Sequence, residues 1–166
     1  MDDIVKHIPR LRRYARALTG DRCLADDLVQ DALERALTKF GLWRQSGRLE
    51  SWLLTILHNV FVNQLHARSR RPAETVLDEL GDQGAIRAQQ NDGLEVRDLD
   101  VALARLSPEQ RAVLLLVTLE EFSYEDTAKI LGIPTGTVMS RLSRARASLR
   151  EQLPGHTAGS KLRIVK

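Results

Sequence analysis

The sequence predicts an all-α protein built from two small helical domains. Leu, Ala, Arg, Asp and Glu dominate its 166 residues, and it has only 10 Gly and 5 Pro, a composition typical of helices rather than strands. Apolar residues recur at helical spacing before residue 71 and again after residue 98. Between these parts the periodicity weakens and glycine and acidic residues accumulate, as expected of a flexible linker.

Two helices are predicted at the start of the chain, over residues 3–18 and 24–40. Thr19 and Gly20 end the first, and Gly41 ends the second. The apolar stripe of the first helix is Ile4, Ile8, Leu11, Ala15 and Leu18. That of the second is Leu24, Leu28, Ala32, Leu33, Ala36, Leu37 and Phe40, and its opposite face is Asp26, Asp27, Gln30, Asp31 and Glu34.

A third helix is predicted to follow the polar loop 44–48. Its apolar residues are Leu49, Trp52, Leu53, Ile56, Leu57, Val60 and Phe61. Trp52 lies within this stripe, so we interpret it as a core residue rather than a platform for stacking. The far end, residues 66–71, is basic, and Pro72 marks a boundary because proline disfavours helix in the residue before it.

The second half begins with a short amphipathic segment, residues 98–106, and a strong helix start. Ser107 suits the N-cap, Pro108 the first helical position, and Gln110 can reach back to the cap. The helix that starts there runs through Val113, Leu114 and Val117.

Residues 122–153 predict two helices joined by a tight turn. Ser123 and Asp126 resemble a capping box, Gly132 ends the first helix, and we expect Thr135 to cap the second. The inward residues are expected to be Ala128, Ile130, Leu131, Val138, Leu142, Ala145 and Leu149. The more exposed ones are expected to be Met139, Ser140, Arg141, Ser143, Arg144 and Arg146. A short turn followed by a basic helix is typical of a helix-turn-helix that enters the major groove of DNA, although an amphipathic hairpin in a small bundle would share the capping and the stripe.

Charge is distributed unevenly along the chain. The net formal charge is +4 over residues 1–70, −5 over 71–100 and +4 over 101–166. Two basic ends suit a polyanion, although solvated helix faces rich in arginine would give the same totals.

Several other classes of protein are disfavoured. A single cysteine, Cys23, rules out an intramolecular disulfide, and the four scattered histidines offer no metal-ligand spacing, so we expect no metal and no cofactor. No apolar run approaches a membrane span, and the first ten residues lack the apolar core of a secretory signal, so we expect a cytoplasmic protein without membrane insertion.

Three motifs together resemble those of the extracytoplasmic-function sigma factors of the sigma-70 family. Residues 124–146, YEDTAKILGIPTGTVMSRLSRAR, resemble the region-four helix-turn-helix. Residues 26–31, DDLVQD, resemble the region-two motif that docks on the clamp of the polymerase β′ subunit. Residues 51–59, SWLLTILHN, resemble the region that opens and reads the minus-ten element. The resemblance covers about residues 10–70 and 98–152 and implies region two at 1–71, a linker at 72–96, region four at 97–153 and a tail at 154–166.

The resemblance also implies roles for individual residues. Those expected to face the polymerase clamp are Asp27, Gln30, Asp31 and Glu34. Asn59 falls where the family captures a flipped-out minus-ten base, and Asn63 lies one turn further on, each amide offering a donor and an acceptor. The candidates for phosphate contacts are Arg44, Arg48, His66, Arg68, Arg70 and Arg71.

For the minus-thirty-five element the implied residues are Tyr124, Glu125, Gly136, Thr137, Met139, Ser140, Arg141, Ser143 and Arg144. Two of them depart from the family pattern: Met139 stands where Lys or Arg is frequent, and Ser143 where a larger side chain is common. Fewer direct base contacts are therefore expected at these positions.

The function implied is that of an alternative sigma factor and not of an enzyme. Its expected partners are core RNA polymerase, through the β′ clamp and β flap, promoter DNA and an anti-sigma factor. A dimeric helix-turn-helix regulator would explain residues 123–146 but not the polar face of the second helix or Asn59. A protein-binding helical adaptor would give no promoter-dependent output. An enzyme is the least favoured class, because no nucleophile with a base and no phosphate-binding glycine loop is present.

Overall fold

The computed structural model describes residues 2–43, 47–70 and 93–153. These residues form seven α-helices and one short 3-10 helix, with no strand among them, so the all-α prediction is confirmed. The chain divides into two compact units, Met1–Ile86 and Arg87–Lys166.

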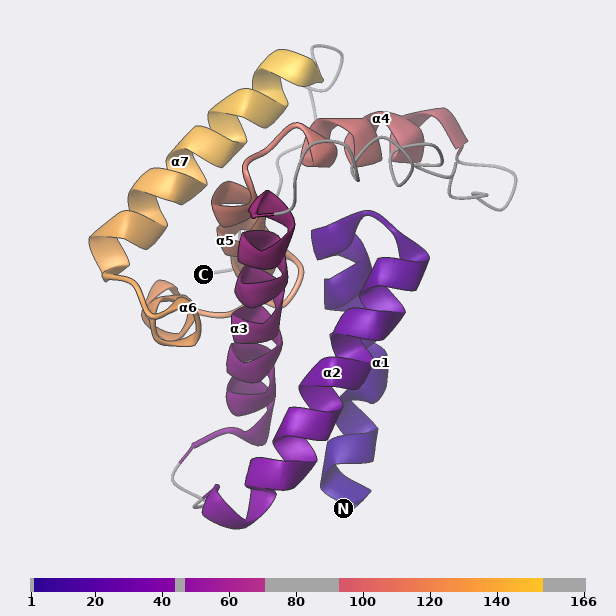
Figure 1. Cartoon of the computed structure of the whole chain (residues 1–166). Helices are drawn as coiled ribbons and strands as arrows, with labels where there is room; N and C mark the ends of the chain where they lie inside the picture. The colour runs from indigo at the N-terminus through magenta and orange to yellow at the C-terminus, as the bar shows by residue number, and fades with distance from the viewer. Residues whose placement is uncertain (1, 44–46, 71–92, 154–166) are drawn as a thin grey trace. The chain divides into compact units, whose positions relative to one another are not determined.

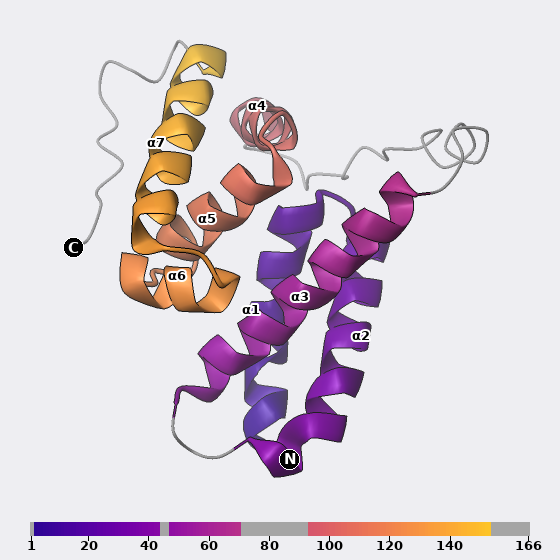
Figure 2. The same cartoon turned by 60° about the vertical axis from the view of Figure 1, so that its left-hand side comes forward.

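The first unit is a bundle of three helices. α1 (Asp2–Thr19) and α2 (Arg22–Lys39) run antiparallel, the 3-10 helix η1 (Phe40–Leu42) extends α2, and α3 (Leu49–Ser69) packs across α2 (Figure 1). All three predicted helices are present, with ends within two residues of those expected. The last residues of α3, 66–69, and its C-cap Arg70 are all exposed, and this end of the helix projects beyond α1 and α2 (Figure 2).

The core of this unit combines residues from all three helices. Its largest fully buried side chains are Tyr14, Leu18, Leu28, Leu53, Leu54, Leu57 and Val60. One predicted core residue is wrong, because Leu37 is 48% exposed. The buried side of α2 is centred on Ala25, Val29 and Ala36. At about 100° per residue, Leu37 turns away from that centre and lies beside Gln30 on the exposed side.

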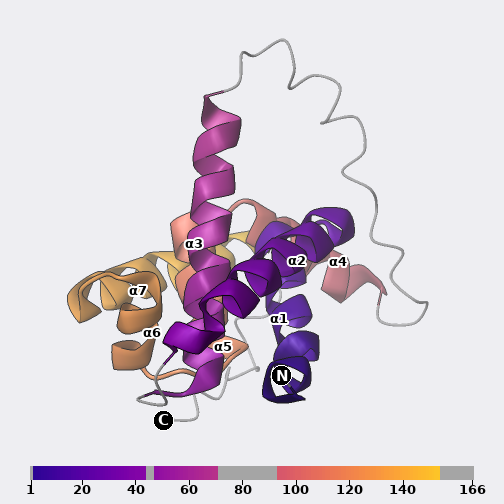
Figure 3. The ribbon, with the colours of Figure 1, turned by 60° about the horizontal axis from the view of Figure 1, so that its bottom comes forward.

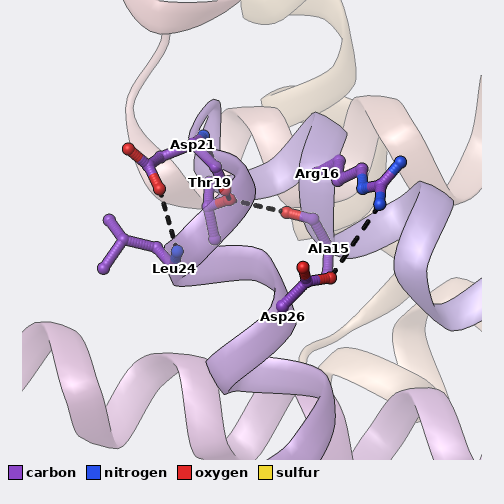
Figure 4. A network of polar contacts seen from close by, with 6 residues as sticks. All are labelled: Ala15, Arg16, Thr19, Asp21, Leu24 and Asp26. Atoms are coloured by element: carbon purple, nitrogen blue, oxygen red, sulfur yellow. Dashed lines mark hydrogen bonds and ion pairs between the residues drawn. The ribbon is translucent and has the colours of Figure 1, made fainter. Parts of the chain in front are cut away.

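The turn between α1 and α2 is held by local hydrogen bonds (Figure 4). Gly20 has a φ of 71°, in the left-handed region that glycine adopts without strain. The Thr19 hydroxyl donates to the carbonyl of Ala15 at 2.9 Å, and the Asp21 carboxylate accepts from the Leu24 amide at 2.9 Å. Asp21 is thus the N-cap of α2, and the predicted end of the first helix at Gly20 is confirmed.

The second unit contains α4 (Gly93–Ala104), α5 (Pro108–Thr118), α6 (Tyr124–Leu131) and α7 (Thr135–Gln152), which are all visible in Figure 2. α4 begins five residues before the amphipathic segment expected at residue 98, within the range predicted as linker. The rest of that linker, residues 72–92, and the tail 154–166 lie outside the described residues. The core joins all four helices through Leu103, Leu106, Val113, Leu114, Ala128, Val138, Leu142 and Ala145.

Three of the four helix-end predictions in this unit hold. Ser107 and Gln110 form the full capping box that opens α5, and the Ser123 hydroxyl accepts from the Asp126 amide at 3.0 Å. Gly132 ends α6 with a φ of 66°. The cap expected at Thr135 is wrong, because Pro134 is the N-cap and makes no side-chain bond. The Pro134 carbonyl already accepts from the amides of Thr137 and Val138, so the helix starts one residue earlier than expected.

Arg111 of α5 lies close enough to Asp100 of α4 for their charges to interact. Burial lowers the pKa of its guanidinium, and the nearby carboxylate of Asp100 on α4 acts in the opposite direction. An arginine stays charged under such a shift. The opposite charges of Arg111 and Asp100 therefore attract each other.

Candidate functional site

The exposed side of α2 is polar, and the opposite side of the helix packs in the core. Asp27, Gln30, Asp31 and Glu34 are all exposed, as predicted, on a helix whose other side is buried. The Gln30 amide donates to the Glu34 carboxylate at 3.4 Å. We call these four residues the α2 face.

A residue of α3 contacts the α2 face. Gln64 donates from Nε2 to Oδ2 of Asp31 at 3.0 Å. This contact could not be predicted from the sequence, because the two residues are far apart in the chain and only the packing of α3 on α2 brings them together. Asp26, next to the face, instead lies 3.9 Å from Arg16 of α1.

The candidate minus-ten residues lie along α3. Asn59, Asn63, His66 and Arg70 are all exposed, and their spacing of four, three and four residues puts them on one side of the helix. Their basic end is the part of α3 that extends past its neighbours in Figure 3. Arg68 is exposed on an adjacent side, and Arg48 is exposed at the N-cap of α3, where it makes no capping bond. Arg44 and Arg71 lie outside the described residues.

Three aromatic rings gather where the loop between α2 and α3 begins and ends. Trp43 stacks on Phe40 with centroids 5.8 Å apart, and its centroid lies 6.1 Å from that of Trp52. All three rings are half-buried. Trp52 is therefore not fully enclosed in the core as interpreted from its stripe, since Trp43 covers one side of it. Phe40 was predicted only as part of the apolar stripe of the second helix, and Trp43 was not predicted to take part, although aromatic residues on both sides of one loop were a usable signal.

The candidate minus-thirty-five residues divide into two groups. Gly136, Met139, Ser140, Ser143 and Arg144 share the exposed side of α7, which we call the α7 face. Thr137 and Arg141 are half-buried at its edge, and Arg146 is half-buried rather than exposed as predicted. On α6, Glu125 is exposed, whereas Tyr124 packs against the core and supports the helix pair.

The described residues contain no group of three or more His, Cys, Asp or Glu side chains placed to bind a metal ion. Among the same residues, no helix has the length and apolar character needed to span a membrane.

Comparison with known families matches each unit separately. A model described as the Sigma2 domain of PhyR matches residues 4–58, and one described as Sigma-70, region 4 matches residues 97–149. The ECF RNA polymerase sigma factor EcfG of Rhodopseudomonas palustris is 39% identical over 148 residues, covering 89% of this chain and 81% of the relative. The ECF RNA polymerase sigma factor SigM of Mycobacterium tuberculosis is 34% identical over 158 residues, covering 95% and 79%.

Solved structures give the same result. The sigma factor RpoE of Bartonella quintana, in complex with the anti-sigma factor NepR, has a TM-score of 0.78 and 37% identity, covering 93% of this chain and 96% of that one. The PhyRSL–NepR complex of Sphingomonas sp. Fr1 has a TM-score of 0.67 at 24% identity, over 96% and 94%, and shares the fold.

Two helical units that match sigma region 2 and sigma region 4 in this order define an initiation factor of the sigma-70 class. The chain belongs to the ECF RNA polymerase sigma factors. It is therefore an alternative sigma factor, a regulator of transcription initiation.

Proposed function

We propose that the chain binds core RNA polymerase through the α2 face and carries it to promoter DNA. The observation that carries this proposal is the contrast between two exposed helix sides. The α2 face carries three carboxylates and one amide, whereas the α7 face carries small residues, Met139 and Arg144 and no acidic residue. Acidic side chains repel DNA and suit a protein partner such as the β′ clamp. Arginine suits phosphates and guanine edges.

In this proposal the second unit reads duplex DNA. α7 lies in the major groove of the minus-thirty-five element, and the first half of the α7 face meets base edges, as in other helix-turn-helix proteins. Glu125, exposed at the first turn of α6, lies at the margin of that contact. The same unit would also meet the β flap of the polymerase.

The first unit then holds the opened strand. Asn59 and Asn63 are exposed and one turn apart on α3, so their amides can pair with the edges of bases that leave the stack. Arg48, His66, Arg68 and Arg70 are exposed and suited to the flanking phosphates. No side chain of the sigma factor performs bond chemistry, and the polymerase supplies the catalysis.

We also propose that an anti-sigma factor controls this chain in the cytoplasm. RpoE of Bartonella quintana, 37% identical, was crystallised with the anti-sigma factor NepR. A partner of this kind would cover surfaces that otherwise bind polymerase and DNA.

Reconstitution tests the proposal. The chain is mixed with core polymerase and fragmented DNA of its own genome, and opened thymines are mapped by permanganate. We expect opening at a defined set of promoters that neither component opens alone. Failure of the chain to associate with core polymerase at low salt would overturn the proposal. Sedimentation adds a second arm, since a dimer of the chain on palindromic DNA would favour the stand-alone regulator.

A further inference from the structure

The exposed side of α7 has a centre made of small residues. Gly136, Ser140, Ser143 and Ala147 are all exposed and follow one another at spacings of four, three and four residues. A Cβ added at Gly136 would meet nothing within 4 Å, so the space in front of the first turn is open. Small side chains let a helix backbone come close to the floor of a groove.

Met139 borders this centre in the first half of the helix. It is 51% exposed, whereas the other large apolar residues of α7, Val138, Leu142 and Leu149, lie in or against the core. A single exposed apolar side chain is ordinary by itself. Its position is what distinguishes it, because side chains in the N-terminal half of a recognition helix are those that reach base edges.

Met139 has the longest side chain in the first half of the α7 face. The hydroxyl of Ser140 donates to the carbonyl of Thr137 at 3.1 Å, so its hydrogen is already used within the helix. Gly136 has no side chain, and Ser143 has a short one. Arg144 is exposed on the opposite border of the small residues.

The chemistry of methionine limits what it can recognise. Its thioether has no hydrogen-bond donor and is a weak acceptor, so it cannot reproduce the polar contacts of Lys or Arg. It is flexible and polarisable, and packs well on irregular apolar surfaces. In the major groove the apolar feature of a base edge is the C5 methyl group of thymine.

We propose that Met139 is a specificity-determining residue that selects thymine in the minus-thirty-five element by packing on its C5 methyl group. This inference rests on the proposed placement of α7 in the major groove and adds the base that is read there. A lysine or arginine at this position would instead favour guanine.

Deletion of single methyl groups from the DNA tests the inference directly. The full chain is bound to core polymerase, and the probe is a fluorescent duplex of a promoter mapped by permanganate, with each thymine of the minus-thirty-five element replaced in turn by deoxyuridine. One replacement is expected to weaken binding of the wild-type holoenzyme about fourfold. This is the change in affinity expected when the burial of one methyl-sized group is lost. Met139→Ala should bind the unmodified duplex about fourfold more weakly and lose sensitivity to that replacement.

Two further variants serve as controls. One tests whether the apolar character of Met139 matters rather than its length, and the other tests whether loss of any exposed apolar side chain has the same effect. Met139→Gln keeps the length but is polar, and is expected to behave like Met139→Ala. Leu99→Ala removes a comparably exposed apolar side chain on α4, 43% exposed, and is expected to keep the full deoxyuridine effect. All variants should retain the helical circular dichroism of the wild type.

The possible failures are distinct. If the wild-type holoenzyme prefers the promoter over a duplex with a scrambled upstream element but ignores every deoxyuridine, the role of Met139 is overturned while the proposed function stands. An unchanged deoxyuridine penalty in Met139→Ala has the same meaning. If the holoenzyme shows no preference for the promoter duplex, the proposed function itself is overturned.

Discussion

α2 and α7 are helices of equal length whose exposed sides differ in charge and in side-chain size. Each has 18 residues, and each buries one side. α2 exposes four acidic residues, Asp26, Asp27, Asp31 and Glu34, together with Arg22, Arg35 and Lys39. α7 exposes mostly small residues, with Arg144, Arg150 and Glu151 as its exposed charges. The buried sides make the two units fold, and in the proposed function the exposed sides decide what each unit binds. Under that proposal, the partner of each helix is set by residues that contribute little to its stability.

The first prediction concerns the buried sides and has the largest expected effect. Leu28 of α2 is 0% exposed and Leu142 of α7 is 2% exposed. Replacing either with Ala should lower the free energy of unfolding of its unit by about 3 kcal/mol, because a cavity replaces a packed side chain. Amide hydrogen exchange within each unit measures both losses. Met139→Ala, at an exposed site, should change stability by less than about 0.5 kcal/mol. Equal losses from Met139→Ala and Leu142→Ala would contradict the division into buried and exposed sides.

The second prediction concerns the exposed side of α2. Gln30→Ala combined with Asp31→Ala removes two side chains of the α2 face and the contact with Gln64. We expect the affinity for core polymerase to fall about tenfold or more, as for central residues of protein interfaces. Co-purification and titration with core enzyme measure the change.

A matched control for that variant comes from α1. Asp2 and Asp3 are also exposed, so Asp2→Ala with Asp3→Ala removes two acidic side chains away from the α2 face. This control should bind polymerase as the wild type does. Unchanged co-purification of the Gln30 and Asp31 variant, with its helical content retained, would remove the α2 face from the interface.

The third prediction concerns the exposed side of α7. Arg144→Ala should weaken promoter binding by the holoenzyme about fivefold or more, since an arginine paired with a base edge contributes on the order of 1–3 kcal/mol. If Arg144 contacts a phosphate, the dependence of log affinity on log salt should also fall by about one. Run-off transcription should decrease in parallel. Arg105→Ala, exposed on the same unit outside α6 and α7, provides the control, and full activity of Arg144→Ala would exclude that residue from the site.

The sequence predicted the helices well because their signals are local. Periodic apolar residues, the Ser107 and Gln110 box and the glycines at positions 20 and 132 act within one or two turns. The exposure of the α2 and α7 faces followed from the same periodicity. What the sequence did not predict depends on how helices meet, as with the Gln64 contact to Asp31 and the pairing of Trp43 with Trp52.

Two wrong predictions have different physical causes. Leu37 was assigned to the core because it is apolar, but the centre of the buried side of α2 is set by small residues such as Ala25 and Ala36, and Leu37 lies away from it. Thr135 was assigned as a cap because threonine is a frequent cap residue. The preceding Pro134 already supplies the carbonyl that starts the helix, which residue preference alone does not reveal.

The last prediction concerns how the two helices begin and has the smallest effect. Asp21 caps α2 with a hydrogen bond to the Leu24 amide, whereas the Pro134 cap of α7 makes no side-chain bond. Asp21→Ala should therefore lower the free energy of unfolding of the first unit by about 1 kcal/mol. Thr135→Ala should lower that of the second unit by less than about 0.5 kcal/mol, because Thr135 already lies inside the helix. Urea unfolding followed by the fluorescence of Trp43 and Trp52 reports the first unit, and hydrogen exchange of α7 reports the second. A loss from Thr135→Ala as large as that from Asp21→Ala would mean that Thr135 stabilises the start of α7 in solution after all.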